Sequence, residues 1–274
     1  MIYGRSQQTL LPLWPELDSL VVSLGPFYTC AWCALERSTT ACAPVAADPE
    51  VAHQLLLFLK SAGVISEKSA DSAVNRSLYD PVGWTYSESW RRPANLESTL
   101  TQTLHAWRSN LDSQDLLWVW RQLSAHEARA YLCSQLRRHR IGTQLVDEVL
   151  NALGQDWSRL SLGRRRYVIW SSVRGAASKL LRSGGNEAAA IQVLSREVQS
   201  RARWLEQRES TGALSRTDYC FLPSSAWRRP LIVEVALETI LRIGDTYWLD
   251  PPSSPACIAK EQRGILNASD HPGT

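Results

Sequence analysis

Apolar residues recur every three or four positions along most of the sequence after residue 95, which is the pattern of helices that bury one face. The two stripes around residues 162–180 and 191–205 also predict that these neighbouring helices pack together. We therefore predict a mainly α-helical, multi-helix globular domain over residues 94–250. This pattern and its stop signals place helices at 96–110, 112–123, 124–140, 143–153, 161–183, 186–207 and 230–243.

Cap chemistry places several of these boundaries. Ser124 and Glu127 have the spacing of a capping box, in which the serine oxygen accepts the glutamate N–H and the glutamate carboxylate accepts the serine N–H. We therefore expect a new helix to begin after Ser124, with Glu127 acting as its cap. Gly184, Gly185 and Gly244 suit the ends of the helices that precede them.

Residues 1–93 give a different pattern, because seven prolines interrupt their apolar stretches. We expect a small irregular region with one helix over 49–62, which Pro49 can begin and Gly63 can end. Aromatic and polar residues then alternate around residues 81–83, which predicts a β-hairpin within about residues 74–90. Residues 251–274 have no apolar period, and we expect them to form a mobile tail.

The overall composition is that of an ordinary globular protein. Of 274 residues 44% are apolar and 21% charged, and 30 Lys plus Arg against 27 Asp plus Glu give a net charge of +3. That charge is too small to predict nucleic-acid or membrane binding by itself. Prolines and acidic residues interrupt the first 20 positions where a signal peptide needs an apolar run, and no window resembles a membrane span. We expect a cytoplasmic protein with no membrane partner.

Cysteines provide the first candidate site. Six cysteines without a secretory signal favour free thiols or a metal site over a disulfide framework. Cys30 and Cys33 have the spacing with which two thiolates share a zinc ion, and Cys42 and His53 follow as further candidate ligands. The motif lacks a glycine after its second cysteine and a second Cys-x-x-Cys pair, so plain buried or surface thiols are the alternative.

Arginines provide the second candidate site. Arg164, Arg165 and Arg166 are consecutive, and Arg174 and Arg182 follow at near-multiples of the helical turn. We expect Arg164, Arg174 and Arg182 to form a solvated basic line opposite the apolar stripe. Together with nearby aromatic residues, the five arginines are candidate nucleic-acid contacts that hold phosphates while bases stack. The alternative is an ordinary solvated helix face.

Three segments resemble a group of uncharacterised bacterial all-helical proteins with no assigned function. The shared features are a Trp-Arg helix, a Glu-bearing helix and a late Ile-Gly-Asp helix end, within residues 95–246. The resemblance implies an all-helical bacterial fold and no activity. The segments are LLWVWRQLSAHEARAYLCSQL from Leu116, VIWSSVRGAASKLL from Val168 and VALETILRIGD from Val235.

No residue pattern typical of an enzyme occurs in the sequence. A Gly-rich phosphate loop and a nucleophile elbow are missing, and His126-Glu127 lacks the second histidine of a zinc protease, since position 130 is alanine. Tryptophan, with 12 residues, and arginine are abundant, and both are enriched at binding hot spots. The sequence therefore favours a non-catalytic binding or adaptor protein in a bacterial multi-protein assembly, with another protein as partner. A nucleic-acid-associated regulatory protein is the alternative, and an enzyme is the least favoured.

Overall fold

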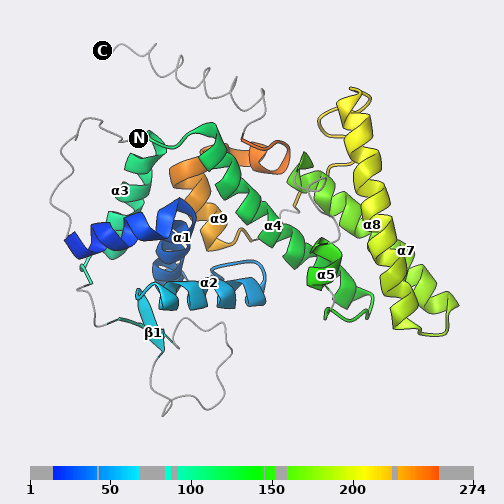
Figure 1. Cartoon of the computed structure of the whole chain (residues 1–274), viewed down its shortest axis with the longest axis horizontal. Helices are drawn as coiled ribbons and strands as arrows, with labels where there is room; N and C mark the ends of the chain where they lie inside the picture. The colour runs from blue at the N-terminus through cyan, green and yellow to red at the C-terminus, as the bar shows by residue number, and fades with distance from the viewer. Residues whose placement is uncertain are drawn as a thin grey trace.

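The computed structural model describes residues 15–41, 43–67, 84–87, 92–144, 146–151, 159–223 and 228–252. These residues form a mainly α-helical structure, which confirms the predicted fold class. Figure 1 shows one long helix, α4, crossing the middle of the molecule, with α1, α2 and α3 on one side and α7 and α8 on the other. The bounds of these helices are Pro15–Ala41 (α1), Pro49–Ser61 (α2), Leu96–Arg108 (α3), Ser113–Arg138 (α4), Leu162–Arg182 (α7) and Glu187–Ser210 (α8).

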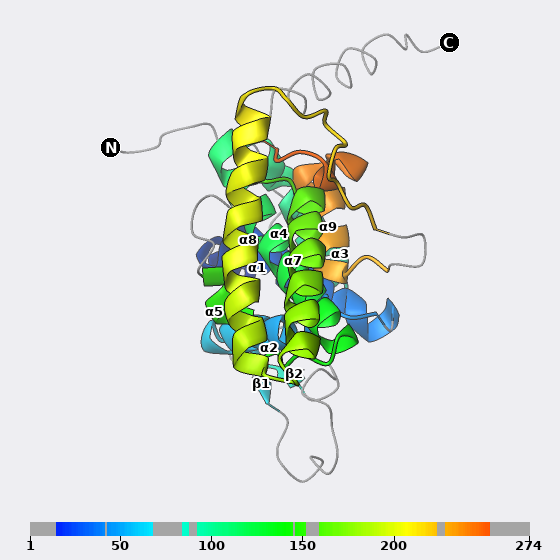
Figure 2. The same ribbon diagram turned by 90° about the vertical axis from the view of Figure 1, so that its right-hand side faces the viewer.

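Helices α7 and α8 form a helical hairpin, as their apolar stripes predict. Figure 2 shows α8 running alongside α7 on the outside of the molecule. Asn186 caps α8, because its side-chain oxygen accepts the backbone N–H of Ala189 at 3.0 Å. Leu194, Val198 and Leu205 are buried on the side of α8 that faces α7. Trp204 is among the side chains of α8 that stay exposed.

Helix α1 lies where the sequence predicts an irregular region, and that prediction is wrong for residues 15–41. The helix has two segments that meet at Gly25, whose φ of 70° and ψ of 175° suit glycine alone. Pro26 can begin the second segment because a first-turn N–H needs no helical partner. Residues 30–35 are buried on all sides and pack against α3 and α9 (Leu231–Ala236). A segment that is apolar all round has no one-sided period to detect.

Helix α4 is continuous where the sequence predicts two helices. Its capping box forms at Asp112, whose carboxylate accepts the N–H groups of Gln114 and Asp115 at 2.7 and 2.8 Å. The Asp115 carboxylate accepts the Asp112 N–H in return at 3.1 Å. Ser124 and Glu127 lie in the middle of the helix and are buried. The predicted cap at Glu127 is therefore wrong, because a local motif does not reveal that other elements cover this face.

The described strands form one antiparallel pair. Strand β1 (Ile65–Glu67) pairs with β2 (Trp84–Tyr86), and Ile65 lies opposite Tyr86. Strand β2 falls within the predicted hairpin, but its partner β1 precedes the predicted range of 74–90, so the predicted start of the hairpin is wrong. The predicted turn at 81–83 lies outside the described residues, as does the predicted tail from residue 253 onward. The predicted helix over 230–243 becomes α9 followed by a π-helical turn, η3 (Leu237–Leu241). The remaining short helices are α5 (Val146–Asn151) and the 3-10 helix η4 (Gly244–Trp248).

One apolar core connects these elements. Trp120 of α4 is fully buried, and its indole N–H donates to the carbonyl oxygen of Tyr247 in η4 at 3.1 Å. The same core includes Trp32 of α1, so the segment before residue 94 packs into the helical region and does not stand apart. Within the described residues, no helix is both long and apolar enough to cross a lipid bilayer.

Replacing Gly25 tests the break in α1. We expect Gly25→Ala to lower the free energy of unfolding by about 1–3 kcal/mol, since a Cβ makes this backbone conformation strained. Ser23→Ala, which removes an exposed hydroxyl two residues earlier, should change it by less than about 0.5 kcal/mol. Urea unfolding followed by circular dichroism measures both. Equal stabilities of the two variants would contradict the strained geometry at Gly25.

Candidate binding groove

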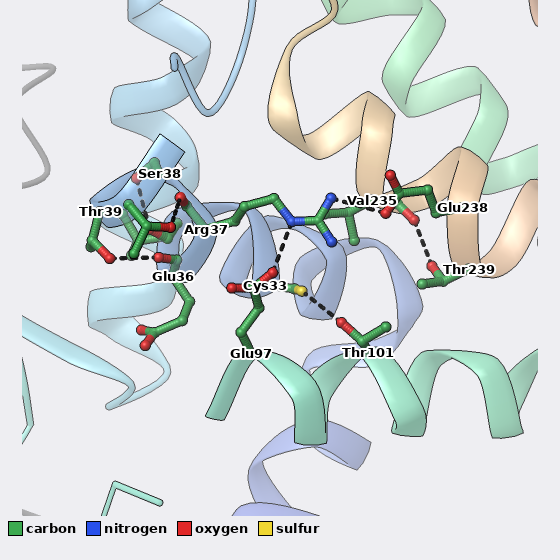
Figure 3. Close-up of polar contacts among 12 residues, drawn as sticks. Cys33, Glu36, Arg37, Ser38, Thr39, Glu97, Thr101, Val235, Glu238 and Thr239 are labelled. Atoms are coloured by element: carbon green, nitrogen blue, oxygen red, sulfur yellow. Dashed lines mark hydrogen bonds and ion pairs between the residues drawn. The ribbon is translucent and has the colours of Figure 1, made fainter. Parts of the chain in front are cut away.

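The predicted zinc ligands Cys30 and Cys33 lie fully buried on α1. Figure 3 shows the Cys33 thiol directed at α3, where its sulfur lies 3.5 Å from the hydroxyl of Thr101. Burial raises the pKa of both thiols, which opposes the thiolate form that zinc requires. Cys42 lies outside the described residues, and His53 is a partly buried residue of α2. In the part of the chain described here, no three His, Cys, Asp or Glu side chains form a metal-binding group. The four-ligand zinc site therefore stays a prediction.

Arg37 occupies the polar space beside this thiol. Its Nε donates to Glu97 of α3 at 3.0 Å and its Nη1 donates to Glu238 of η3 at 2.9 Å. Figure 3 shows the guanidinium reaching from α1 to both carboxylates. These ion pairs join three elements that are far apart in the sequence. Since each charge in the triad has a partner, we assign the cluster to the packing of α1, α3 and η3.

The five arginines proposed as nucleic-acid contacts do not share one environment. Arg174 and Arg182 are exposed on α7, but Arg164 and Arg165 are only 3% and 1% exposed. The prediction that Arg164 belongs to a solvated line is therefore wrong. The loop after α8 covers the first turn of α7, and the Arg164 guanidinium donates to the carbonyl of Ser215 in that loop at 2.8 Å. The spacing of Arg164 along its helix does not show that a loop distant in the sequence covers it.

Arg165 is part of the core. Its Nε donates to the Leu160 carbonyl at 3.0 Å, and its Nη1 donates to the Ser124 hydroxyl of α4 at 2.9 Å. The guanidinium also lies over the Trp120 ring, 5.0 Å from its centroid. Burial lowers the pKa of Arg165 to about 9. Arg166, the fifth arginine, is partly buried against α4 and η4.

A groove lies on the outer side of the α7–α8 pair, and we call it the aromatic groove. It has a volume of about 600 Å³. Two of its aromatic side chains, Trp204 and Tyr219, are 40% and 38% exposed, which is unusual for side chains of this size. The lining residues are Tyr167 of α7, Arg196, Glu197, Ser200, Arg201 and Trp204 of α8, and Tyr219 of the following loop.

Three rings form a continuous surface in the aromatic groove. The Tyr219 ring centroid lies 4.9 Å from that of Tyr167 and 5.2 Å from that of Trp204, with Trp204 edge-on at 84°. Phe221 extends the same cluster toward Trp170, at 5.1 Å between centroids. Tyr219 has a φ of 56°, an uncommon conformation for a residue with a side chain. The loop therefore holds the Tyr219 ring between the rings of α7 and α8, although the positive φ of Tyr219 is energetically unfavourable.

Charges of both signs surround the rings. Arg201 pairs with Glu197 one turn earlier at 2.7 Å, and the Arg208 guanidinium lies over the Trp204 ring, 5.4 Å from its centroid. Arg196 is exposed at the edge of the groove. Helix α8 is balanced overall, with four arginines (196, 201, 203 and 208) and four glutamates (187, 197, 206 and 209). The groove is thus polar at its rim without a general positive charge.

The sequence pattern does not predict this groove, although one signal for it exists. The apolar stripe of 186–207 includes Leu194, Val198 and Leu205, and Trp204 lies next to this stripe among charged residues. A tryptophan beyond the buried stripe indicates an exposed aromatic residue. The contribution of Tyr219 carries no comparable signal, because it depends on how the loop folds back over α7.

Comparisons with known proteins give no further guidance. No family model, no curated protein and no solved structure matches this chain. The resemblance to bacterial helical proteins therefore stays a prediction, and any function must be argued from the geometry of the chain itself.

Arg165 and Arg174 provide a matched test of the two arginine environments on α7. We expect Arg165→Ala to lower the free energy of unfolding by about 3 kcal/mol, because it leaves a cavity and removes two buried hydrogen bonds. The exposed Arg174→Ala should change it by less than about 0.5 kcal/mol. Urea unfolding of both variants measures the difference. A similar, small effect of both substitutions would show that Arg165 faces solvent after all.

Proposed function

We propose that this chain is a non-catalytic binding protein, an adaptor that holds a segment of a partner protein in the aromatic groove. The observation that carries this proposal is the surface formed by the rings of Tyr167, Trp204 and Tyr219. Exposed aromatic rings with little rotational freedom provide large contact areas at low entropic cost, as in protein interfaces. An adaptor of this kind would serve within a multi-protein assembly.

The groove chemistry specifies the partner segment. An apolar ring surface accommodates an aromatic or proline side chain, and the exposed guanidinium of Arg196 suits a carboxylate next to it. The volume of about 600 Å³ is enough for several side chains of an extended peptide. We therefore expect the partner to present a short segment that has an acidic residue beside an aromatic residue or a proline.

Nucleic acid is the second candidate. Two guanidinium–aromatic stacks favour it, Arg174 over Trp170 at 4.7 Å and Arg208 over Trp204 at 5.4 Å, since such pairs also stack on bases. The balanced charge of α8 argues against it, because a site that follows a phosphate backbone needs an excess of positive charge. Protein therefore remains the favoured partner, and Arg174 and Arg182 are the exposed members of the proposed basic line.

Two tryptophans of similar exposure allow a controlled test of the groove. Peptides selected from a random display library on the wild-type protein should bind Trp204→Ala about 30-fold more weakly, a loss of about 2 kcal/mol. Trp118→Ala is the control, because Trp118 on α4 is 44% exposed and lies outside the groove. Fluorescence anisotropy of a labelled peptide measures both affinities.

The same assay separates the two candidate partners. An adaptor should prefer peptides with acidic residues and bind single-stranded oligonucleotides weakly at every salt concentration. A nucleic-acid protein should bind oligonucleotides with an affinity that falls steeply with salt and depends on Arg174 and Arg182. Failure to select any peptide, or equal losses for Trp204→Ala and Trp118→Ala, would refute the adaptor function.

A further inference from the structure

A second group of polar side chains lies inside the molecule, between α4, α7, η4 and residues 228–230. Glu127 and Tyr247 are 6% and 0% exposed. The carboxylate Oε1 of Glu127 and the hydroxyl of Tyr247 have no hydrogen-bond partner among the described residues. The same holds for Nε and Nη1 of Arg166 and for Nε of Arg229. Buried polar atoms of this kind normally have a protein, water or ligand partner.

The charges in this group do not balance. The guanidinium groups of Arg166 and Arg229 act on Glu127, and those of Arg165 and Arg229 act on Tyr247. Two positive groups thus act on this one carboxyl group. Burial is the largest influence on Glu127 and raises its pKa to about 8, even though both arginines oppose this shift. A carboxyl group in this state is largely uncharged near neutral pH, which leaves Arg166 without the charge of Glu127 and Arg229 with a long contact to Asp245.

Packing holds the arginine at the centre of the group in place. The Arg166 guanidinium lies over the ring of Tyr131, 4.3 Å from its centroid, and near the ring of Trp248 at 5.2 Å. These rings cover the faces of the guanidinium, while its Nε and Nη1 have no hydrogen-bond partner among the described residues. Arg229 is partly exposed, with 37% of its side chain accessible, and its nearest carboxylate contact is a long one, 3.9 Å to Asp245. Arg229 therefore connects the buried group to solvent.

We propose that Arg166, Arg229 and Tyr247 form a binding site for a small tetrahedral oxyanion, such as inorganic phosphate, sulfate or the phosphate group of a small metabolite. The two arginines supply charged N–H donors, and Tyr247 supplies an O–H donor from η4. Donors from three elements suit an anion whose oxygens point in several directions, whereas a planar carboxylate has two oxygens. Uncharged Glu127 adds a fourth donor, and ionised Glu127 repels the anion.

Sulfate titration at constant ionic strength tests this site, because sulfate keeps its charge over the whole pH range used. We expect saturable binding by isothermal titration calorimetry at millimolar sulfate and about pH 6.5. Affinity should fall at least about tenfold in Arg229→Gln and in Arg166→Gln. Arg229→Gln is the safer variant, since its side chain is partly exposed. Arg216→Gln is the control, because Arg216 is an exposed arginine paired with Asp250 outside the group. It should bind sulfate as the wild type does.

The pH dependence provides a second, independent readout. Wild-type affinity should decrease at least about tenfold between about pH 6.5 and 9 as Glu127 ionises, and Glu127→Gln should remove most of this decrease. The proposal fails if heats are non-saturable, or if Arg229→Gln and Arg216→Gln bind sulfate equally. It also fails if affinity is independent of pH in the wild type. In those cases the buried group is a water-filled network with a purely structural role.

Discussion

Burial of charged side chains between α4 and α7 is the constraint on which the rest of the structure depends. Arg165 lies in the core over Trp120, and taking a guanidinium out of water is unfavourable unless its donors are satisfied. The Leu160 carbonyl and the Ser124 hydroxyl satisfy two of them. These contacts have strict geometry, so α4 and α7 can pack in few other ways. Because Trp120 also donates to the Tyr247 carbonyl, the same cluster positions η4.

The aromatic groove is a consequence of this arrangement. With α7 fixed on α4, the loop after α8 folds back over the first turn of α7, where the Phe221 N–H donates to the Gly163 carbonyl at 3.0 Å. A side chain at Gly163 would collide with the sulfur of Cys220, so glycine permits the close approach of loop and helix. The loop in turn brings Tyr219 beside Tyr167 and completes the ring surface of the groove. Core packing and the proposed binding surface are thus one continuous structure.

The sequence predicts those helices that have one apolar face and one polar face. It does not predict the burial of residues that are covered by segments distant in the sequence. The α7–α8 pair follows from two apolar stripes, and its bounds lie within three residues of the expected ones. Residues 30–35 of α1 have no polar face, so they show no one-sided periodicity. Glu127 and Arg164 occupy positions where local rules predict a cap and a solvated face, yet η4 and the loop after α8 cover them. The groove depends on Tyr219, which reaches α7 only through long-range folding.

Urea unfolding between about pH 6.5 and 8 tests most directly whether Glu127 is buried among these guanidinium groups. The pKa of Glu127 is raised from 4.5 to about 8 in the folded chain, so in this range the folded state holds a proton that the unfolded state has lost. The free energy of unfolding should therefore fall by about 1.4 kcal/mol per pH unit near pH 6.5 and by about half that slope near pH 8, about 1.6 kcal/mol in total, in wild type but not in Glu127→Gln. His126, whose pKa burial lowers from 6.5 to about 4, adds an opposite change of at most about 0.4 kcal/mol, which is the same in both proteins and cancels in their comparison. Parallel pH profiles of the two proteins would contradict the buried cluster between α4 and α7.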